Sequence, residues 1–216
     1  MGRQKLQKDI CYICCKTGTD DRDHVIPSSF FNKPKPANLL TFPAHHQCHS
    51  EMDEEYFRVL AAGQGLEASK SATDLWQGKI FRSVGRNMPL QQLIRLSILN
   101  CVPIISKGGI YIGSTPAIRF DRNRIDPTIK KIVRGLYFRE TEELLCANTE
   151  FKWEVVNEEP TGPMRQVLEG SQKGLLYTDV FESAFAIVEE AALEITVWWL
   201  LFYKGLLIAC FTKRTK

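Results

Sequence analysis

The sequence predicts an α+β fold, in which a small cysteine-rich amino-terminal module precedes a larger α+β domain with an antiparallel sheet. Three observations support this prediction. Residues 10–62 are polar, rich in turn-forming residues and contain four of the seven cysteines. Residues 74–139 place apolar side chains at helical spacing. From residue 151 onward, short β-rich runs alternate with turns, which is typical of an antiparallel sheet.

The composition sets the domain organisation and class. With 216 residues, 44% hydrophobic and 25% charged, the chain is typical of a soluble globular protein of one or two domains. We expect a boundary near residue 62, with a module at 1–62 and an accessory domain at 63–216. The amino terminus, MGRQKLQKDI, is polar and lacks an apolar run, which predicts a cytoplasmic protein.

The module is expected to end in a helix that begins near residue 49. Met52, Tyr56 and Leu60 recur at helical spacing, acidic residues at 51–55 suit the amino end of a helix, and Gly63 can cap the other end. Residues 63–73, GQGLEASKSAT, read as a linker.

The middle of the chain is predicted to be mainly helical. Helices are expected over 74–86 and 88–100, and a strand is expected within 111–121 after the turn at 106–109. A further helix is expected from Asp126, a residue type that caps helices. Its predicted core face consists of Ile129, Ile132, Val133 and Leu136.

The carboxy-terminal runs at 151–156, 174–190, 194–203 and 206–212 predict the antiparallel sheet. The most apolar segment, residues 195–211, is interrupted by Lys204 and Gly205 after nine residues. A helix needs about 20 apolar residues to cross a bilayer. We therefore expect a buried hairpin here and no membrane partner.

Two short ligand pairs predict a metal site. Cys11 and Cys14 form a C-x-x-C pair, and an H-x-x-C pair, His45 and Cys48, follows 31 residues after Cys14. Each tight turn can present two ligands to one tetrahedral Zn²⁺, which would hold together a loop that is too polar to fold by itself. The neighbouring Cys15 and His46 are within reach of the same site as alternative ligands.

The other cysteines are expected to be ordinary thiols. In a chain without a secretory signal, cysteines are more often reduced thiols or metal ligands than members of a disulfide framework. Cys101, Cys146 and Cys210 lie in apolar surroundings, and small buried side chains are expected at all three positions.

The segment between the two ligand pairs contains D-H-V-I-P at 23–27 and N-L at 38–39, and C-H follows at 48–49. In order, identity and spacing, residues 9–62 resemble the HNH endonuclease family. The resemblance implies a ββα-metal fold, in which a two-stranded hairpin and a helix hold one catalytic divalent cation, with the structural zinc outside it.

The resemblance also implies roles for individual residues. His24 would be the general base, Asp23 and His49 would hold the cation, usually Mg²⁺, and Asn38 would fix the loop that orients His24. Phosphodiester hydrolysis needs such groups, because a water must lose a proton and an alkoxide must leave. The chain departs from the family pattern in having His45 where cysteine is commoner. It also lacks the lysine that often follows the last motif position.

The charge is unevenly distributed along the chain. Residues 1–139 contain 21 Lys and Arg against 12 Asp and Glu, a balance of +9, whereas residues 140–216 contain 7 against 13, a balance of −6. A basic first part suits a polyanionic partner. The basic residues that we expect to contact nucleic acid are Arg119, Arg122, Arg124, Lys130, Lys131 and Arg134. The same spacing also fits the solvated face of an amphipathic helix.

Together these features predict a metal-dependent endonuclease that hydrolyses DNA, with RNA as an open alternative substrate. The accessory domain would position the substrate or bind a protein partner or a second copy of the chain. The competing hypothesis is a non-catalytic zinc module that binds nucleic acid or protein.

Overall fold

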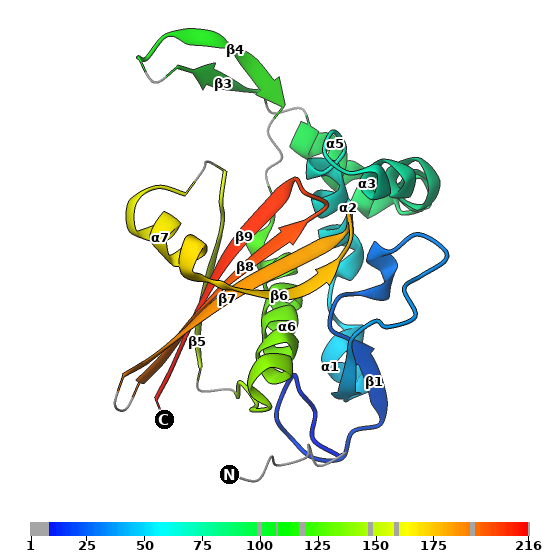
Figure 1. Cartoon of the computed structure of the whole chain (residues 1–216). Helices are drawn as coiled ribbons and strands as arrows, with labels where there is room; N and C mark the ends of the chain where they lie inside the picture. The colour runs from blue at the N-terminus through cyan, green and yellow to red at the C-terminus, as the bar shows by residue number, and fades with distance from the viewer. Residues whose placement is uncertain are drawn as a thin grey trace.

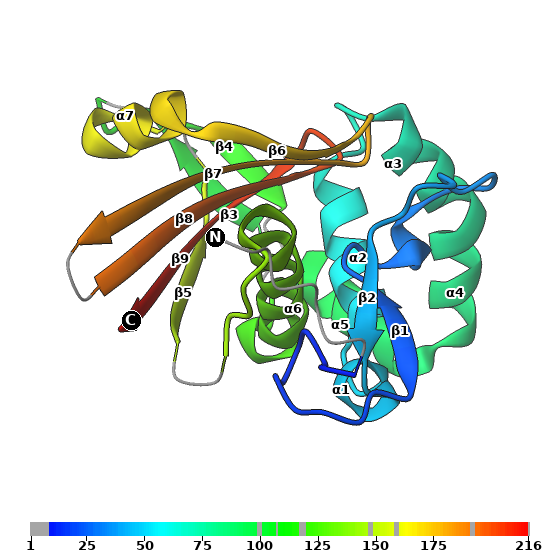
Figure 2. The ribbon, with the colours of Figure 1, turned by 60° about the horizontal axis from the view of Figure 1, so that its bottom comes forward.

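The computed structural model describes residues 9–98, 101–106, 108–116, 120–146, 149–157, 160–190 and 193–215. The fold is mixed α+β with antiparallel sheets, as the sequence predicts. Helix α6 (Arg122–Thr141) lies at the centre. On one side it faces a five-stranded sheet, and on the other it faces the amino-terminal hairpin and helix α2 (Figures 1 and 2).

The amino-terminal segment forms a hairpin followed by a short helix. Strands β1 (Asp21–His24) and β2 (Thr41–Ala44) pair antiparallel, with Asp21 opposite Ala44 and His24 opposite Thr41. Helix α1 (His46–Ser50) follows β2 directly. Between the strands, η1 (Ser28–Phe30) contributes Phe30 to the core.

The single helix expected from residue 49 is interrupted. Helix α1 ends at Ser50, and α2 (Glu54–Gln64) begins after Asp53, whose side chain accepts a hydrogen bond from the Tyr56 amide at 3.1 Å. This aspartate cap provides a new helix start, so α1 and α2 are separate helices. Gly63 lies inside α2 and does not end it.

A helical region replaces much of the expected linker. Helix α3 (Lys70–Leu75) begins after Ser69, which caps it through the Ala72 amide. It continues through a π-helical turn, η2 (Trp76–Ile80), into α4 (Phe81–Arg86). Helix α5 (Met88–Ile98) agrees with the prediction over its described length.

The strand expected within 111–121 belongs to a hairpin that was predicted only in part. Strand β4 (Tyr111–Pro116) pairs with β3 (Cys101–Ile105). The hairpin extends away from the body of the molecule (Figure 1). Several of its large apolar side chains are therefore exposed, including Ile105, Ile110 and Ile112.

Helix α6 begins four residues before the predicted start. Asp121, not Asp126, caps it by accepting a hydrogen bond from the Asn123 amide at 3.0 Å. The backbone of Asp121 is also held by the Tyr56 hydroxyl, which accepts from its amide. The predicted core face is confirmed, because all four of its residues are fully buried: Ile129, Ile132, Val133 and Leu136.

The predicted carboxy-terminal sheet is confirmed. Its strand order is β5-β9-β8-β7-β6, and all neighbours are antiparallel. The strands are β5 (Glu150–Val155), β6 (Gln172–Tyr177), β7 (Phe181–Glu190), β8 (Leu193–Phe202) and β9 (Leu206–Thr215). A tight turn joins β8 to β9, with positive φ at Tyr203 and Lys204, so the apolar segment 195–211 is a hairpin. Helix α7 (Gly162–Gly170), between β5 and β6, was not predicted.

One buried cluster connects the two expected domains. It extends from Cys11 and Tyr12 through the α6 face to Trp198 and Cys210, so residues on both sides of position 62 pack in a common core. The division into 1–62 and 63–216 stays a prediction. In the described part of the chain, no helix is both long and apolar enough to span a bilayer.

The close approach of α6 to the amino-terminal segment occurs at Gly135. A Cβ atom at this position would lie 2.4 Å from Cγ2 of Val25, which is itself fully buried. Gly135→Ala should therefore lower the free energy of unfolding by about 1–3 kcal/mol, as overpacking does. Urea denaturation would measure this change.

The matched control is Gly85→Ala, because Gly85 lies in helix α4 and a Cβ there meets nothing within 4 Å. This control should be stabilised by about 0.5–1 kcal/mol, since alanine favours a helix. Equal effects of the two substitutions would contradict the packing described for α6.

Candidate metal and catalytic site

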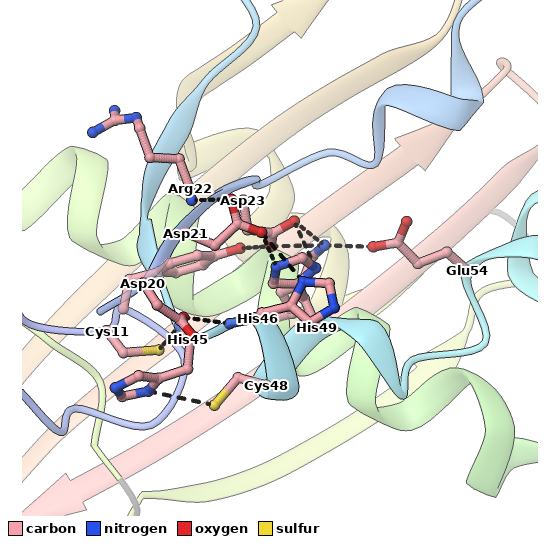
Figure 3. Close-up of polar contacts among 12 residues, drawn as sticks. Cys11, Asp20, Asp21, Arg22, Asp23, His45, His46, Cys48, His49 and Glu54 are labelled. Carbon is pink, nitrogen blue, oxygen red and sulfur yellow. Dashed lines mark hydrogen bonds and ion pairs between the residues drawn. The ribbon is translucent and has the colours of Figure 1, made fainter. Parts of the chain in front are cut away.

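The four expected zinc ligands come together at the base of the hairpin. Ligand atoms of Cys11, Cys14, His45 and Cys48 all lie within 4.8 Å of one another. Nδ1 of His45 is 3.3 Å from the Cys14 sulfur and 3.8 Å from the Cys48 sulfur. We call these residues the four-ligand cluster; part of it is drawn in Figure 3. Three thiols and one imidazole are a donor set that tetrahedral Zn²⁺ prefers.

Local hydrogen bonds orient the His45 ring toward the sulfur atoms of the cluster. Nε2 of His45 lies 3.1 Å from the Thr17 carbonyl, which can only accept, so the proton sits on Nε2 and the Nδ1 lone pair faces the sulfur atoms. The His45 amide also donates to the Cys11 sulfur at 3.4 Å. The cluster can thus hold a metal ion, and its chemistry is consistent with zinc.

Burial and the neighbouring sulfur atoms shift the pKa values of two thiols in the cluster. Burial and then the neighbouring Cys14 and Cys11 sulfurs raise the pKa of Cys48 to about 12. Burial also raises the pKa of Cys14, but a hydrogen bond from the Lys16 backbone and others from Cys11 and Cys48 lower it overall. Adjacent thiolates repel one another, and a divalent cation would remove this repulsion.

The cysteines outside the four-ligand cluster differ in their contacts. Cys15 forms a disulfide with Cys146, with their Cα atoms 5.7 Å apart. The expectation of a thiol at these two positions is therefore wrong, because the segment after α6 returns to the first ligand pair. Cys210 is fully buried as expected, whereas Cys101 is exposed because it lies on the projecting β3–β4 hairpin.

A second group of candidate ligands lies on the hairpin and α1. Oδ2 of Asp21 is 3.1 Å from Nε2 of His49 and 3.4 Å from Nδ1 of His46, and the three residues lie close enough to share a cation. His46 and His49 are three residues apart, which places them on one face of α1. Figure 3 shows their rings turned toward Asp21. We call Asp21, His46 and His49 the hairpin triad.

Asp23, the expected cation ligand, is mostly engaged by other groups. Its buried carboxylate accepts a hydrogen bond from the Tyr12 hydroxyl at 2.5 Å and forms an ion pair with the Lys131 ammonium at 2.8 Å. Its nearest approach to His49 is 3.9 Å, from Oδ1 to Nδ1. The pairing with Lys131 makes Asp23 a poorer candidate than Asp21 for holding a second cation.

His24 and Asn38 are the other two residues for which the resemblance implies a catalytic role. His24 is half-buried at the end of β1, and desolvation lowers its pKa, with charges on Asp23, Lys35, Lys131 and Glu54 acting in both directions. A lowered pKa favours the neutral imidazole that a general base requires. Because β1 pairs with β2 without a bulge, alternation places His24 and Asp23 on opposite faces.

Asn38 is exposed in the loop before β2, and its carbonyl accepts a hydrogen bond from the Tyr177 hydroxyl at 3.2 Å. Among the described residues, no hydrogen bond connects the Asn38 side chain to His24. The structure thus brings Asp23 and His49 near each other but does not bring Asn38 into the same cluster.

The basic residues expected to contact nucleic acid have mostly intramolecular partners. Arg119 lies outside the described residues. Arg122 donates to the Trp153 carbonyl, with its guanidinium 4.1 Å from that ring, and Arg124 pairs with Asp53.

The remaining three lie along α6. Lys130 pairs with Asp126 at 2.8 Å, and Arg134 packs over the Phe151 ring. The Lys131 side chain is completely buried, so it has no surface to offer to a phosphate. These residues therefore do not form one exposed basic face.

Sequence reasoning gave Asp21 no role, and it named His46 only as an alternative ligand of the zinc site. The signal was present, because alternate strand positions place Asp21 on the same face as Asp23, and His46 has helical spacing to His49. With this geometry established, comparisons of the chain with family models, curated proteins and solved structures find no match.

The four-ligand cluster predicts the metal content of the purified protein. We expect about one zinc ion per chain, bound through Cys and His ligands. Cys14→Ser should lose most of this zinc, whereas Cys101→Ser, which removes an exposed thiol outside the cluster, should keep it. Elemental analysis after dialysis measures both. A parent protein without zinc, or equal zinc in the two variants, would contradict the assignment.

The buried ammonium of Lys131 predicts a large stability difference between neighbouring lysines. Lys131→Met leaves the buried Asp23 carboxylate without its cation, which should lower the free energy of unfolding by about 3–5 kcal/mol. Lys130→Met removes only a half-exposed pair with Asp126 and should cost no more than about 1 kcal/mol. Chemical denaturation compares the two variants, and similar losses would argue against the buried pair.

Proposed function

We propose that this chain is a metal-dependent endonuclease of the HNH type that hydrolyses phosphodiester bonds in DNA. The observation that carries the proposal is the hairpin triad, because Asp21, His46 and His49 converge on the hairpin and helix that also carry the four-ligand cluster. One carboxylate and two imidazoles are ligands for a divalent cation beside a surface that is open to solvent.

In this proposal, the four-ligand cluster holds a structural zinc ion that fixes the start of α1. His49 follows Cys48 directly in the chain, so fixing Cys48 also fixes His49 relative to β1. The hydrogen bond from the His46 amide to Asp20, at 2.8 Å, holds the same end of the helix. The ligands of the hairpin triad are thereby oriented by groups that do not touch substrate.

The donor set also suggests which cation the hairpin triad takes. Imidazole nitrogen suits first-row transition metals, whereas Mg²⁺ prefers oxygen ligands and keeps several waters. We therefore propose Mn²⁺, Ni²⁺ or a similar ion for this site in place of Mg²⁺. When bound, such a cation would stabilise the negative charge that develops on the phosphate and on the leaving oxygen.

His24 supplies the proton chemistry in this proposal. A neutral imidazole takes a proton from water, the resulting hydroxide attacks the phosphorus, and the bond to the leaving oxygen breaks. Desolvation lowers the pKa of His24, which supports this role because the imidazole is then neutral near pH 7 and has a lone pair that can accept a proton.

The alternative function is a non-catalytic zinc module that binds nucleic acid or protein. It is favoured by the ion pair and hydrogen bond that Asp23 makes with Lys131 and Tyr12, and by the regular pairing of β1, which turns His24 away from both Asp23 and Asp21. It requires zinc and a binding surface but no turnover.

Cleavage of supercoiled plasmid with Mg²⁺, Mn²⁺ or Ni²⁺ tests the proposal. The parent should nick the plasmid, with Mn²⁺ or Ni²⁺ more effective than Mg²⁺. His24→Ala should lower the rate by about 10²–10⁴-fold, the usual contribution of a general base. Asp21→Asn should lower it as well, whereas Asp74→Asn, which removes an exposed carboxylate on α3, should not.

The metal-loaded parent could instead bind DNA without nicking it under any of these metals, with zinc still present. That result would reject the endonuclease and support the non-catalytic module.

A further inference from the structure

A cavity of about 700 Å³ lies on the side of α2 that faces η2 and α4. Its walls come from η1, the amino-terminal half of α2, the π-helical turn and α4. All nine lining residues have side chains that can form hydrogen bonds, and none is an apolar residue. We call this cavity the basic cleft.

The basic cleft carries a net positive charge. Four cationic residues line it, Arg58, Lys79, Arg82 and Arg86, against two acidic residues, Glu54 and Glu55. Both carboxylates already have donors within the protein. Glu54 pairs with Lys131 at 2.5 Å, and Glu55 accepts from the Ser83 hydroxyl and from Arg58.

Arg58 forms the buried part of the cleft. Only 9% of this residue is exposed, yet its Nε has no hydrogen-bond partner within the described part of the chain. Within the ranges that the structure describes, its ion pair with a carboxylate is long, at 3.4 Å from Nη2 to Oε1 of Glu55. A buried guanidinium with an unused donor is costly unless an acceptor reaches it. Arg58 lines the cleft, so an anion bound there would lie beside its guanidinium group.

Positive charges gather around Lys79 as well. Its ammonium donates to the Phe31 carbonyl at 2.8 Å, and burial together with Lys35, Arg58 and Lys33 lowers its pKa. An anion in the cleft would relieve this repulsion. Arg82 and Arg86 are exposed and line the cleft, and among the described residues the Arg86 side chain makes no hydrogen bond or ion pair.

We propose that the basic cleft binds phosphate groups, and that its ligand is the phosphodiester backbone of a polynucleotide. Guanidinium groups match phosphate oxygens in geometry and charge. Sites for free nucleotides are mostly lined by apolar side chains that hold the base, and this cleft has none. A backbone needs only charge and hydrogen-bond donors.

The cleft also adjoins the candidate catalytic region. Glu54 lines the cleft and pairs with Lys131, which in turn pairs with Asp23 on β1. A strand held by Arg58, Arg82 and Arg86 would therefore pass close to the hairpin. This inference rests on the proposed function for the choice of a polynucleotide, while the phosphate chemistry of the cleft is independent of it.

Fluorescence anisotropy with a labelled oligonucleotide, measured without added divalent cation over a range of salt concentrations, tests the proposal. Arg82→Gln/Arg86→Gln should weaken binding about 10-fold or more and make the salt dependence shallower by about 1.5–2 in logarithmic slope, since two phosphate contacts are lost. Both residues are exposed, so the variant should stay folded. Arg58→Lys keeps the charge but loses the planar donors, and it should also weaken binding.

The matched control is Lys152→Gln/Lys173→Gln. These lysines are exposed on β5 and β6, at opposite edges of the sheet, and their loss changes the net charge equally. The control should bind like the parent. Equal losses in the two double variants would overturn the proposal, because they would show a response to net charge alone, and so would full affinity in Arg82→Gln/Arg86→Gln.

Competition identifies the source of the phosphate. An unlabelled oligonucleotide should displace the probe at far lower concentration than AMP or inorganic phosphate. Displacement by AMP at equal concentration would overturn the polynucleotide assignment. A parent that binds through the cleft but never nicks DNA would contradict only the proposed endonuclease. Nicking with unchanged affinity in Arg82→Gln/Arg86→Gln would contradict only the cleft.

Discussion

The ion pair between Lys131 and Asp23 is the interaction on which the rest of this structure depends. A fully buried ammonium from α6 lies between carboxylates of β1 and α2, at 2.8 Å from Asp23 and 2.5 Å from Glu54. Removing Lys131 would leave the buried Asp23 carboxylate without its cation, so the central helix and the hairpin are held in one relative position. The same pair occupies Asp23, whereas the exposed Asp21 carboxylate lies against His46 and His49.

Much of the fold follows from local patterns, and the exceptions have tertiary causes. The apolar face of α6 and the β8–β9 hairpin were predicted because helical periodicity and tight turns depend on residues that are close together in the sequence. The start of α6 was not, since Asp121 and Asp126 are equally able to cap a helix. The choice between them depends on the Tyr56 hydroxyl, which holds the Asp121 amide from 65 residues away.

In the candidate site, too, the local patterns could be predicted and the contacts between distant residues could not. The four-ligand cluster could be predicted because each ligand pair is local and the zinc-binding spacing is specific. The pairing of Asp23 with Lys131 could not, because the partners are 108 residues apart and a lysine on an amphipathic helix ordinarily faces water. Likewise, nothing near Cys15 indicates that Cys146 returns to it. With Asp23 paired, the residues of the hairpin and α1 that lie close enough to share a second cation are Asp21, His46 and His49.

The position of the second cation is tested most directly by crystals of the zinc-loaded protein grown with Mn²⁺, using anomalous scattering to locate the manganese. We expect a peak at coordination distance from Asp21 and His49, with Lys131 still paired to Asp23. A peak coordinated by Asp23 with Lys131 displaced, or no manganese on the hairpin at all, would contradict this account.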